Sequence, residues 1–490
     1  MKLFRPALHL ALGAQLLATA APDSRAAELG TEQPSMPAQA AGQQHERQRI
    51  NEQVDDLQQR VESLEAQQFS PTTRMNMLVR STAGGVNYSG NQINAATNTW
   101  GEGKDSLKLR NAFTLNYDIM LFLDTSTTGK DLLRTILRMA NFGQSAFGVS
   151  GTQPNPAPLS QLDEGFEDPQ GPNIVDINRL FYSTPVNRYT TIVFGPRVRQ
   201  NDALPLWPTI YARPGSELLL KIFTQAGSTS AYSLLIGPGG GVIFKDRERS
   251  SGWSAGLNYI AVNGERGNTD STDRDPGGMG TAGSAATAMA QLSYTGKGWN
   301  VSAAVAQNGT GVRQDGTNYW RRLQPQFGSR DQRRNSYSND GVTRALSLAG
   351  YWQPAQSGWL PSISAGVGFN QADLDQSSIV VNGQTLKTIN SAGWLLGLTW
   401  DNLFAKSNQL GVAIGQPTFV TSVNQQQARD GNYAFEIYYK IQATDNIIIT
   451  PALFYLSRPR GADTQAPGIS SSTYSSFDAL GALVEFTLKI

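Results

Sequence analysis

Apolar and polar residues alternate along several long segments of the chain, most clearly over residues 107–123. The apolar residues there share one parity: Leu107, Leu109, Phe113, Leu115, Tyr117, Ile119, Leu121 and Leu123. The opposite parity carries Lys108, Arg110, Thr114, Asn116 and Asp118. A period of two predicts a β-strand with one apolar face and one polar face. The segment exceeds the ~5–6 residues of a typical soluble strand, and it is long enough to cross a bilayer when tilted.

The same alternation recurs through the rest of the chain, for example in residues 253–259, 394–400 and 433–442. Aromatic residues often stand at the ends of such segments, where membrane barrels carry aromatic girdles. We count about 14–16 segments of this kind, and bacterial outer-membrane barrels close with an even number of strands. The pattern therefore predicts an all-β fold, a transmembrane antiparallel β-barrel of about 14–16 strands.

The last residues of the chain form another alternating segment. Its apolar residues share one parity: Leu480, Ala482, Val484, Phe486, Leu488 and Ile490. A final amphipathic strand that reaches the C-terminus is what a barrel needs to close its edge. This feature favours the barrel over the alternative of an exported soluble β-sandwich.

Stretches without alternation separate the predicted strands. Residues 261–285 and 308–343 are polar and unpatterned, and they predict long loops on one side of the barrel. Gly237–Gly241 (GPGGG) predicts a flexible turn.

The N-terminus carries the features of a secretory signal peptide, which we expect to span residues 1–26. Lys2 and Arg5 precede an apolar stretch at residues 8–21, and small residues follow it. Residues 27–44, rich in Ala, Pro, Gln and Gly, predict a linker.

Residues 45–69 predict a short α-helical coiled coil, because apolar residues recur alternately at spacings of four and three. Its core residues are Ile50, Val54, Leu57, Val61 and Leu64. A dimer and a trimer both remain open, and so does the alternative of a single amphipathic helix packed on a domain. The barrel domain is expected over residues 70–490.

Composition excludes several classes of function. The formal net charge is +1, so no basic field indicates nucleic acid. The chain contains no Cys, and its two His are His9 and His45, both ahead of the expected barrel. The barrel therefore lacks the residues for thiol chemistry or for His acid–base and metal chemistry. We expect no enzymatic activity, no cofactor and no metal site.

Four short motifs carry a resemblance to a known family. The most specific are Ile177–Tyr182 (INRLFY) and Gly195–Gln200 (GPRVRQ). Gly129–Thr135 (GKDLLRT) and Leu453–Gly461 (LFYLSRPRG) support them. With the coiled coil directly before Phe69–Arg74, the chain resembles the cyanobacterial outer-membrane porins of the OprB-like carbohydrate-selective porin family over roughly residues 50–490.

The resemblance implies a passive outer-membrane channel for inorganic ions and small hydrophilic solutes, with carbohydrates as candidate solutes. It also implies contact with outer-membrane lipid, a homotrimer, and a coiled coil in the periplasm. The wall-binding S-layer-homology domain of many members is expected to be absent, because residues 27–44 are too few for it, and wall contact therefore stays open. The alternative function is a structural envelope protein that links outer membrane and cell wall through the coiled coil.

Charged residues in the two most specific motifs, and at the start of the loop that follows the second, are the candidate pore constriction: Arg179, Arg197, Arg199 and Asp202. Rings of charge at a constriction set the selectivity of a channel. The alternative is that these charges pair with one another and hold a loop in place. Arg134 and Arg138 share a parity and are further candidates for the lumen. The apolar stretch 203–208 (ALPLWP) predicts either an inward constriction loop or a trimer contact.

Overall fold

A computed structural model describes residues 72–90, 93–100, 107–148, 155–168, 170–211, 213, 219–269, 277–309, 342–356, 358–373, 380–381, 384–385, 387–427, 431–459 and 477–490. The expected signal peptide, linker and coiled coil lie outside these residues, as do the coiled-coil core positions. Among the described residues, no helix has the length and apolar character needed to cross a membrane.

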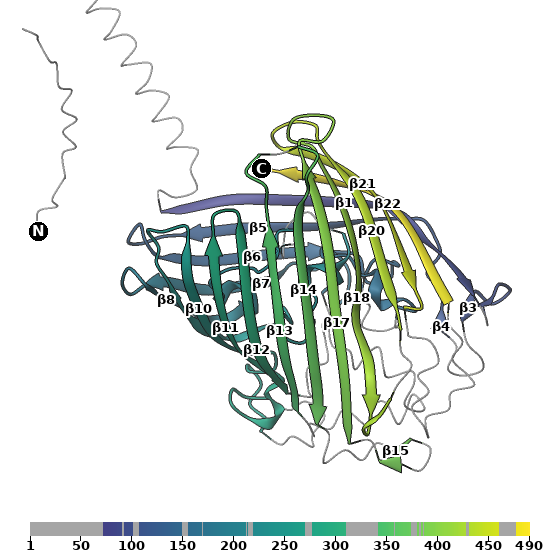
Figure 1. The fold of residues 1–490 in the computed structure, drawn as a ribbon, viewed down its shortest axis with the longest axis horizontal. Helices are drawn as coiled ribbons and strands as arrows, with labels where there is room; N and C mark the ends of the chain where they lie inside the picture. The colour runs from purple at the N-terminus through teal and green to yellow at the C-terminus, as the bar shows by residue number, and fades with distance from the viewer. Residues whose placement is uncertain are drawn as a thin grey trace, which may run out of the picture. The chain divides into compact units, whose positions relative to one another are not determined.

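Sixteen antiparallel strands pair in a closed ring, and the two-residue strand β19 (Gln426–Gln427) lies beside one of them. The ring consists of β1 (Thr73–Gly90), β5 (Thr114–Thr125), β6 (Leu132–Ala140), β7 (Asp176–Pro185), β8 (Thr190–Arg199), β9 (Ile236–Lys245), β10 (Gly252–Ala261), β11 (Ala286–Gly296), β12 (Trp299–Gly309), β13 (Val342–Trp352), β14 (Ser362–Asp373), β17 (Thr388–Asp401), β18 (Gln409–Val423), β20 (Tyr433–Gln442), β21 (Ile447–Ser457) and β22 (Phe477–Lys489). Each strand pairs with the next along the chain, as Figure 1 shows for β10 to β14. The predicted all-β barrel and its strand number are confirmed.

Five shorter strands complete the described part of the fold, in two small sheets. One contains β2 (Ile93–Asn94), β3 (Thr99–Trp100) and β4 (Leu107–Lys108), and the other contains β15 (Val380–Val381) and β16 (Gln384–Thr385).

The last strand closes the ring. β22 pairs with β21 on one side and with β1 on the other. Beyond the strand, Ile490 N donates to Met77 O at 2.9 Å and Met77 N donates to Ile490 O at 2.8 Å. The ladder therefore continues to the final residue, and neither terminal strand is left with an unpaired edge.

Side chains alternate between the two faces of the ring. In β10, Trp253 is 66% exposed on the outer face, and its neighbour Ser254 is 4% exposed on the inner face. The alternation predicted over residues 253–259, 394–400 and 433–442 is confirmed.

Two local predictions are wrong. The strand expected over residues 107–123 is interrupted: Leu107–Lys108 belongs to the small sheet, Leu109 is buried, and β5 begins at Thr114. Gly237–Gly241 is part of strand β9 rather than a flexible turn. Its glycines are needed for close packing, since a Cβ on Gly240 would lie 2.1 Å from Val193 O of β8.

The connections differ in length at the two ends of the barrel. Short turns, such as residues 186–189, 297–298 and 443–446, lie at the end that holds the start of β1 and the end of β22. The connections at the other end are longer, and they include residues 141–175 and 200–235. Outer-membrane barrels place short turns in the periplasm and long loops outside the cell.

The outer face carries a boundary of aromatic residues near the turn end. Its members include Trp253, Tyr294, Trp299, Trp352, Trp359 and Trp400. The Tyr294 ring lies 5.1 Å from the Trp253 ring and 5.4 Å from the Trp299 ring. Such a girdle marks the interface between hydrocarbon and water.

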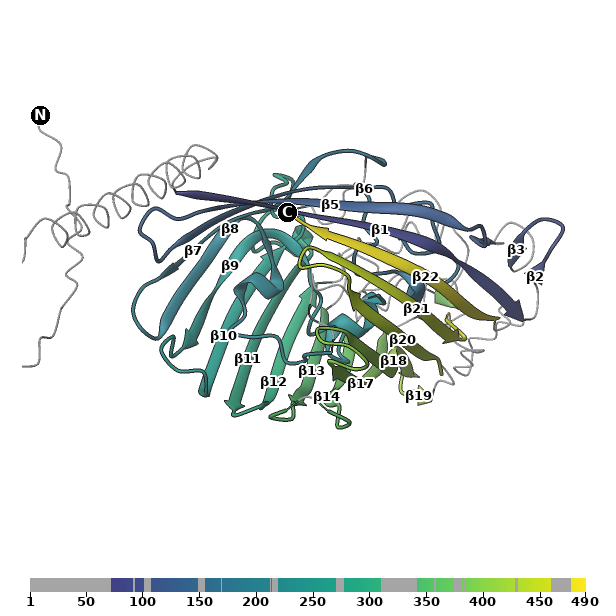
Figure 2. The ribbon, with the colours of Figure 1, turned by 90° about the horizontal axis from the view of Figure 1, so that it is seen from above.

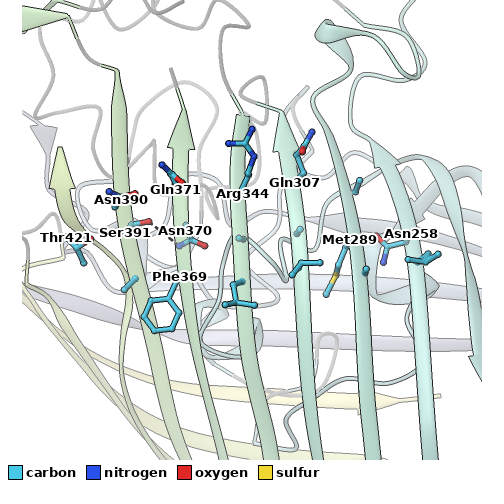
Figure 3. A pocket seen from close by; sticks show the side chains of 18 residues that line it. Asn258, Met289, Gln307, Arg344, Phe369, Asn370, Gln371, Asn390, Ser391 and Thr421 are labelled. Carbon is cyan, nitrogen blue, oxygen red and sulfur yellow. Dashed lines mark hydrogen bonds between the residues drawn. The ribbon is translucent and has the colours of Figure 1, made fainter. Parts of the chain in front are cut away.

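A row of polar residues marks the opposite boundary. Gln307, Arg344, Gln371 and Asn390 are cross-strand partners on β12, β13, β14 and β17, and they lie towards the loop ends of these strands in Figure 3. The hollow of about 890 Å³ drawn there opens outward, because Val305 and Phe369 of its lining are exposed whereas Met289 is buried. This hollow faces lipid rather than the lumen.

One motif of the family resemblance stabilises a short turn. Asp131 follows Gly129, whose φ of +74° favours glycine. The carboxylate of Asp131 accepts hydrogen bonds from the hydroxyls of Thr127 (2.6 Å) and Thr128 (2.6 Å), and from the hydroxyl of Tyr182 in β7 (2.8 Å). The hydrogen bonds from Thr127 and Thr128 hold the pKa of Asp131 far below its usual range.

We expect Asp131→Ala to lower the thermal unfolding temperature at neutral pH. Because the folded-state pKa of Asp131 is depressed, its contribution to stability is present above the ordinary carboxyl pKa and is lost as the pH falls through the folded value. The difference in unfolding temperature between Asp131→Ala and the parent protein should therefore narrow at strongly acidic pH. Asp445→Ala, in another short turn, is the control, and an equal gap at both pH values would contradict the assignment.

The aromatic boundary near the turns and the polar row near the loops predict at which outer-face positions a charged side chain is tolerated. Leu348 lies on the outer face of β13, midway between Arg344 and Trp352. We expect Leu348→Arg to reduce the free energy of unfolding from lipid vesicles by about 2–4 kcal/mol, and Gln371→Arg by about 0–1 kcal/mol. Urea titration measures both, and equal losses would show that the boundary is misplaced.

Candidate functional site

Two long connections fold into the barrel instead of remaining outside it. We call residues 141–148 and 155–168 the first inner segment, and residues 200–211 and 219–235 the second inner segment. Both are rich in buried residues, among them Phe142, Phe147, Leu162, Leu204, Tyr211, Phe223 and Tyr232. In Figure 2 the second inner segment runs within the ring of strands. These segments narrow the lumen and are the candidate constriction.

Polar side chains of the wall bind the second inner segment. Ser364 Oγ of β14 accepts hydrogen bonds at 3.0 Å from the backbone N of Tyr211 and of the residue before it. Asn308 of β12 donates to Ser230 O at 2.7 Å, and Gln291 of β11 donates to the Tyr232 hydroxyl at 3.0 Å. The polar inner face predicted by the alternation thus serves partly to satisfy the backbone of this segment.

Glycines of the wall let the second inner segment approach the backbone. A Cβ on Gly366 of β14 would lie 2.0 Å from Ala226 O. A Cβ on Gly397 of β17 would lie 2.4 Å from Cγ of Tyr211. Because backbone and ring atoms occupy these positions, the segment is docked at a fixed place on the wall.

The apolar stretch 203–208 belongs to this docked segment. Trp207 packs edge-on against Tyr232, with ring centroids 4.9 Å apart, and Leu204 joins the same apolar cluster. The structure therefore supports the inward-loop interpretation of the stretch and not the trimer contact.

The first inner segment packs at another part of the wall. Phe147 meets Phe454 of β21 edge-on, with ring centroids 6.3 Å apart. Arg110 Nη1, from the connection before β5, donates to Gly143 O at 2.9 Å and to Ser145 O at 2.7 Å. Desolvation by burial lowers the pKa of Arg110.

The two inner segments join inside the barrel. Leu162 and Leu220 form an antiparallel bridge, and Asp163 N donates to Leu219 O at 2.9 Å. The wall holds this junction through Glu436 of β20, whose Oε2 accepts Leu220 N at 2.6 Å and whose Oε1 accepts the Tyr211 hydroxyl at 3.0 Å. A displacement of one inner segment is therefore transmitted to the other.

A cluster of charges lies between the first inner segment and the wall. Arg138 of β6 holds Asp118 of β5 through two hydrogen bonds of 2.6 and 3.0 Å. Arg80 of β1 interacts electrostatically with Asp118 and with Asp163 of the first inner segment. Arg199 interacts electrostatically with Asp163, Arg138 and Arg80, so basic groups from several strands face one acidic segment.

The structure brings three of the four predicted constriction residues together. Arg179 Nε donates to Asp202 Oδ2 at 2.9 Å, and Arg199 N donates to the same oxygen at 2.9 Å. Arg197 pairs instead with Asp176 at 3.5 Å, with both side chains roughly 40% exposed. The bond from Arg199 is made by its backbone amide, and the Arg199 guanidinium donates to Asn201 Oδ1 instead. Both guanidinium groups interact electrostatically with Asp202, which leaves a local surplus of positive charge.

The two further lumen candidates face the interior of the barrel and are paired. Arg134 makes two hydrogen bonds to Asp124, at 2.7 and 2.6 Å, and its side chain keeps 32% exposure. Arg138 also lies over the Phe166 ring at 4.5 Å. Both arginines carry a neutralising partner, Asp124 for Arg134 and Asp118 for Arg138.

Sequence reasoning missed Arg80, Asp163, Glu164 and Glu485. The inward parity of Arg80 and Glu485 on alternating strands was a signal that could have found them. Asp163 and Glu164 lie in an unpatterned connection, so nothing in the sequence placed them inside. Among the described residues, no group of acidic or His side chains could hold a metal ion.

Comparison with protein families gives one match. Residues 385–473 match the model of the "Carbohydrate-selective porin, OprB family". The resemblance to the OprB family is confirmed. The match supports an outer-membrane channel at an outer-membrane location. It includes Glu436 but none of the arginines of the charge cluster, so it assigns no role to those arginines.

Relatives and similar structures extend the comparison. An uncharacterized protein of Synechocystis sp. is 26% identical over 436 residues, which cover 84% of this chain and 70% of that protein. An uncharacterized protein of Nostoc sp. is 24% identical over 445 residues, which cover 86% of this chain and 68% of that protein. The structure of the anion-selective porin from Comamonas acidovorans is 11% identical with a TM-score of 0.46, and the match covers 86% of this chain and 99% of that porin. The high-pH structure of Pseudomonas putida OprB is 11% identical with a TM-score of 0.47, and the match covers 86% of this chain and 94% of OprB.

The docking of the second inner segment predicts a cost for filling its glycine contacts. We expect Gly397→Ala to reduce the free energy of unfolding by about 1–3 kcal/mol, because Tyr211 must move. Gly358→Ala is the matched control, since a Cβ there meets no atom within 4 Å. Urea titration in vesicles compares the two variants, and equal stability would contradict a docked segment.

Proposed function

We propose that the protein is a passive outer-membrane channel for small hydrophilic solutes and inorganic ions, with carbohydrates among the solutes. The observation that carries the proposal is a closed ring of sixteen strands with an apolar outer face and a polar inner face. Barrels of about 16–18 strands are wide enough to leave an aqueous lumen. The OprB-family match over residues 385–473 supports the same function.

The inner segments and the charge cluster are the proposed selectivity element. The guanidinium groups of Arg179 and Arg199 both interact electrostatically with Asp202, and Arg199 also interacts with Asp163 of the acidic first inner segment. A solute that passes between them meets guanidinium donors on one side and carboxylates on the other. Such a transverse arrangement orients hydroxyl groups and small ions, and the local positive surplus favours anions.

The assembly is proposed on the family resemblance. The protein acts as a homotrimer embedded in outer-membrane lipid, with residues 45–69 as a coiled coil in the periplasm. Neither the passage of solutes nor the trimer requires a catalytic group, a cofactor or a nucleic acid, and we propose no enzymatic role.

Planar-bilayer recording tests the channel directly. The protein should give stepwise current, and a salt gradient should produce a reversal potential that indicates anion preference. We expect Arg199→Ala to shift this potential towards zero, because it removes a guanidinium group that interacts electrostatically with Asp202 and Asp163. Arg197→Ala, at a residue paired with Asp176, should change it less.

Two results would overturn the proposal. Stable insertion without current steps would exclude the channel. Equal shifts from Arg199→Ala and Arg197→Ala would exclude the charge cluster as the selectivity element.

A further inference from the structure

Two buried carboxyl groups meet where the first inner segment touches the barrel wall. Glu164 belongs to the segment, Glu485 to the inner face of β22, and both are fully buried. Thr82 of β1 donates its hydroxyl to Glu164 Oε1 at 3.4 Å, and Thr487 donates to Glu485 Oε1 at 2.9 Å. Each carboxyl group therefore has one oxygen supplied with a donor by the wall.

The second oxygen of each group has no donor. Glu164 Oε2 and Glu485 Oε2 are buried and lack a hydrogen-bond partner. The two side chains nevertheless lie within hydrogen-bond reach of each other. Two carboxylates cannot bond without a proton between them, whereas one shared proton turns the contact into a carboxyl–carboxylate hydrogen bond. A single proton thus satisfies both orphaned oxygens.

The surrounding charges do not replace this proton. The strongest electrostatic interactions of Arg80 of β1 are with Glu485 and Glu164, so one guanidinium faces two acids. Arg138 is already engaged by Asp118 of β5 through two hydrogen bonds.

Among the remaining charged neighbours, Arg199 adds one positive charge near Asp163 and Arg80, and the others are acidic. Asp163, the residue before Glu164, also interacts with Arg80, and Glu436 of β20 interacts with Glu485. A buried cluster with more acids than cations is stabilised by binding a proton.

We propose that Glu164 and Glu485 form a proton-dependent clamp that holds the first inner segment against the wall and releases it when the proton is lost. The clamp would regulate the constriction, so this inference rests on the proposed channel function. Glu164 follows the residues that bridge to the second inner segment, so release at Glu164 would loosen both segments.

The direction of the pH response follows from burial. Desolvation, together with the negative charge of Glu485, raises the pKa of Glu164 well above its ordinary value. A raised carboxyl pKa means that the folded state retains a proton that the unfolded chain has released. The clamp is therefore strongest below the ordinary Glu pKa and weakens as the pH rises through the folded value. A rise in pH therefore opens the clamp.

A single cysteine can report the release, because the natural chain contains none. Ser160 lies in the first inner segment and is fully buried, so Ser160→Cys places a thiol that is protected while the clamp is closed. A membrane-impermeant maleimide is added to the full-length protein in lipid vesicles at neutral and at alkaline pH. Ser89→Cys, exposed at the end of β1, corrects for the ionisation of the thiol itself.

The corrected labelling rate of Ser160→Cys should rise by up to about tenfold per pH unit between the ordinary Glu pKa and the folded pKa, and level off above the folded pKa, as expected when opening releases one proton. Glu164→Gln in the same background should abolish the rise, because an uncharged amide donates to Glu485 as a protonated carboxyl group does. Glu485→Gln provides the reciprocal test if Glu164→Gln does not fold. Glu265→Gln, at an exposed residue between β10 and β11, should keep the rise.

A labelling rate that is equal at both pH values would overturn the clamp, and so would an unchanged rise in both Glu→Gln variants. Bilayer current recorded in parallel separates the two proposals. A pH-dependent labelling rate without any current supports the clamp and contradicts the channel. Current with pH-independent labelling supports the channel and contradicts the clamp.

Discussion

The structure depends on one constraint, which is that backbone polar groups in a bilayer must be paired within the protein. Pairing of β22 with β1, continued to Ile490 and Met77, meets this constraint by removing both sheet edges. Closure in turn fixes which parity of every strand faces lipid and which faces the interior. The girdle near the turns, the polar row that includes Arg344, and the polar inner wall all follow from it.

Closure also creates an interior that the chain itself partly fills. The two inner segments need partners for their own backbone, and the wall supplies them through Ser364, Asn308 and Glu436. Where a segment must approach more closely, the wall carries glycine, as at Gly397 beneath Tyr211. The inner face is therefore matched to a particular packing and is not simply a hydrophilic lining.

Charged residues inside the barrel have two different roles. Pairs such as Arg138–Asp118 and Arg134–Asp124 are mutually neutralised and stabilise neighbouring strands. The Arg199 guanidinium donates to the uncharged Asn201, and in the proposed channel it supplies the charge that acts on a solute. The proposed channel needs both kinds, because a rigid wall is required to hold an unneutralised charge in position.

The sequence by itself determined the fold class, the even strand number and the lipid-facing parity, because alternation with period two is local and repeats in every strand. It also singled out Arg179 and Arg199 through their motifs, and Asp202 just after the second motif, as candidates. It failed at residues 107–113, where a connection happens to alternate, and at Gly237–Gly241, where glycine serves strand packing. Only the tertiary structure placed Glu164 against Glu485, since their contact depends on how an unpatterned connection folds back across a closed ring.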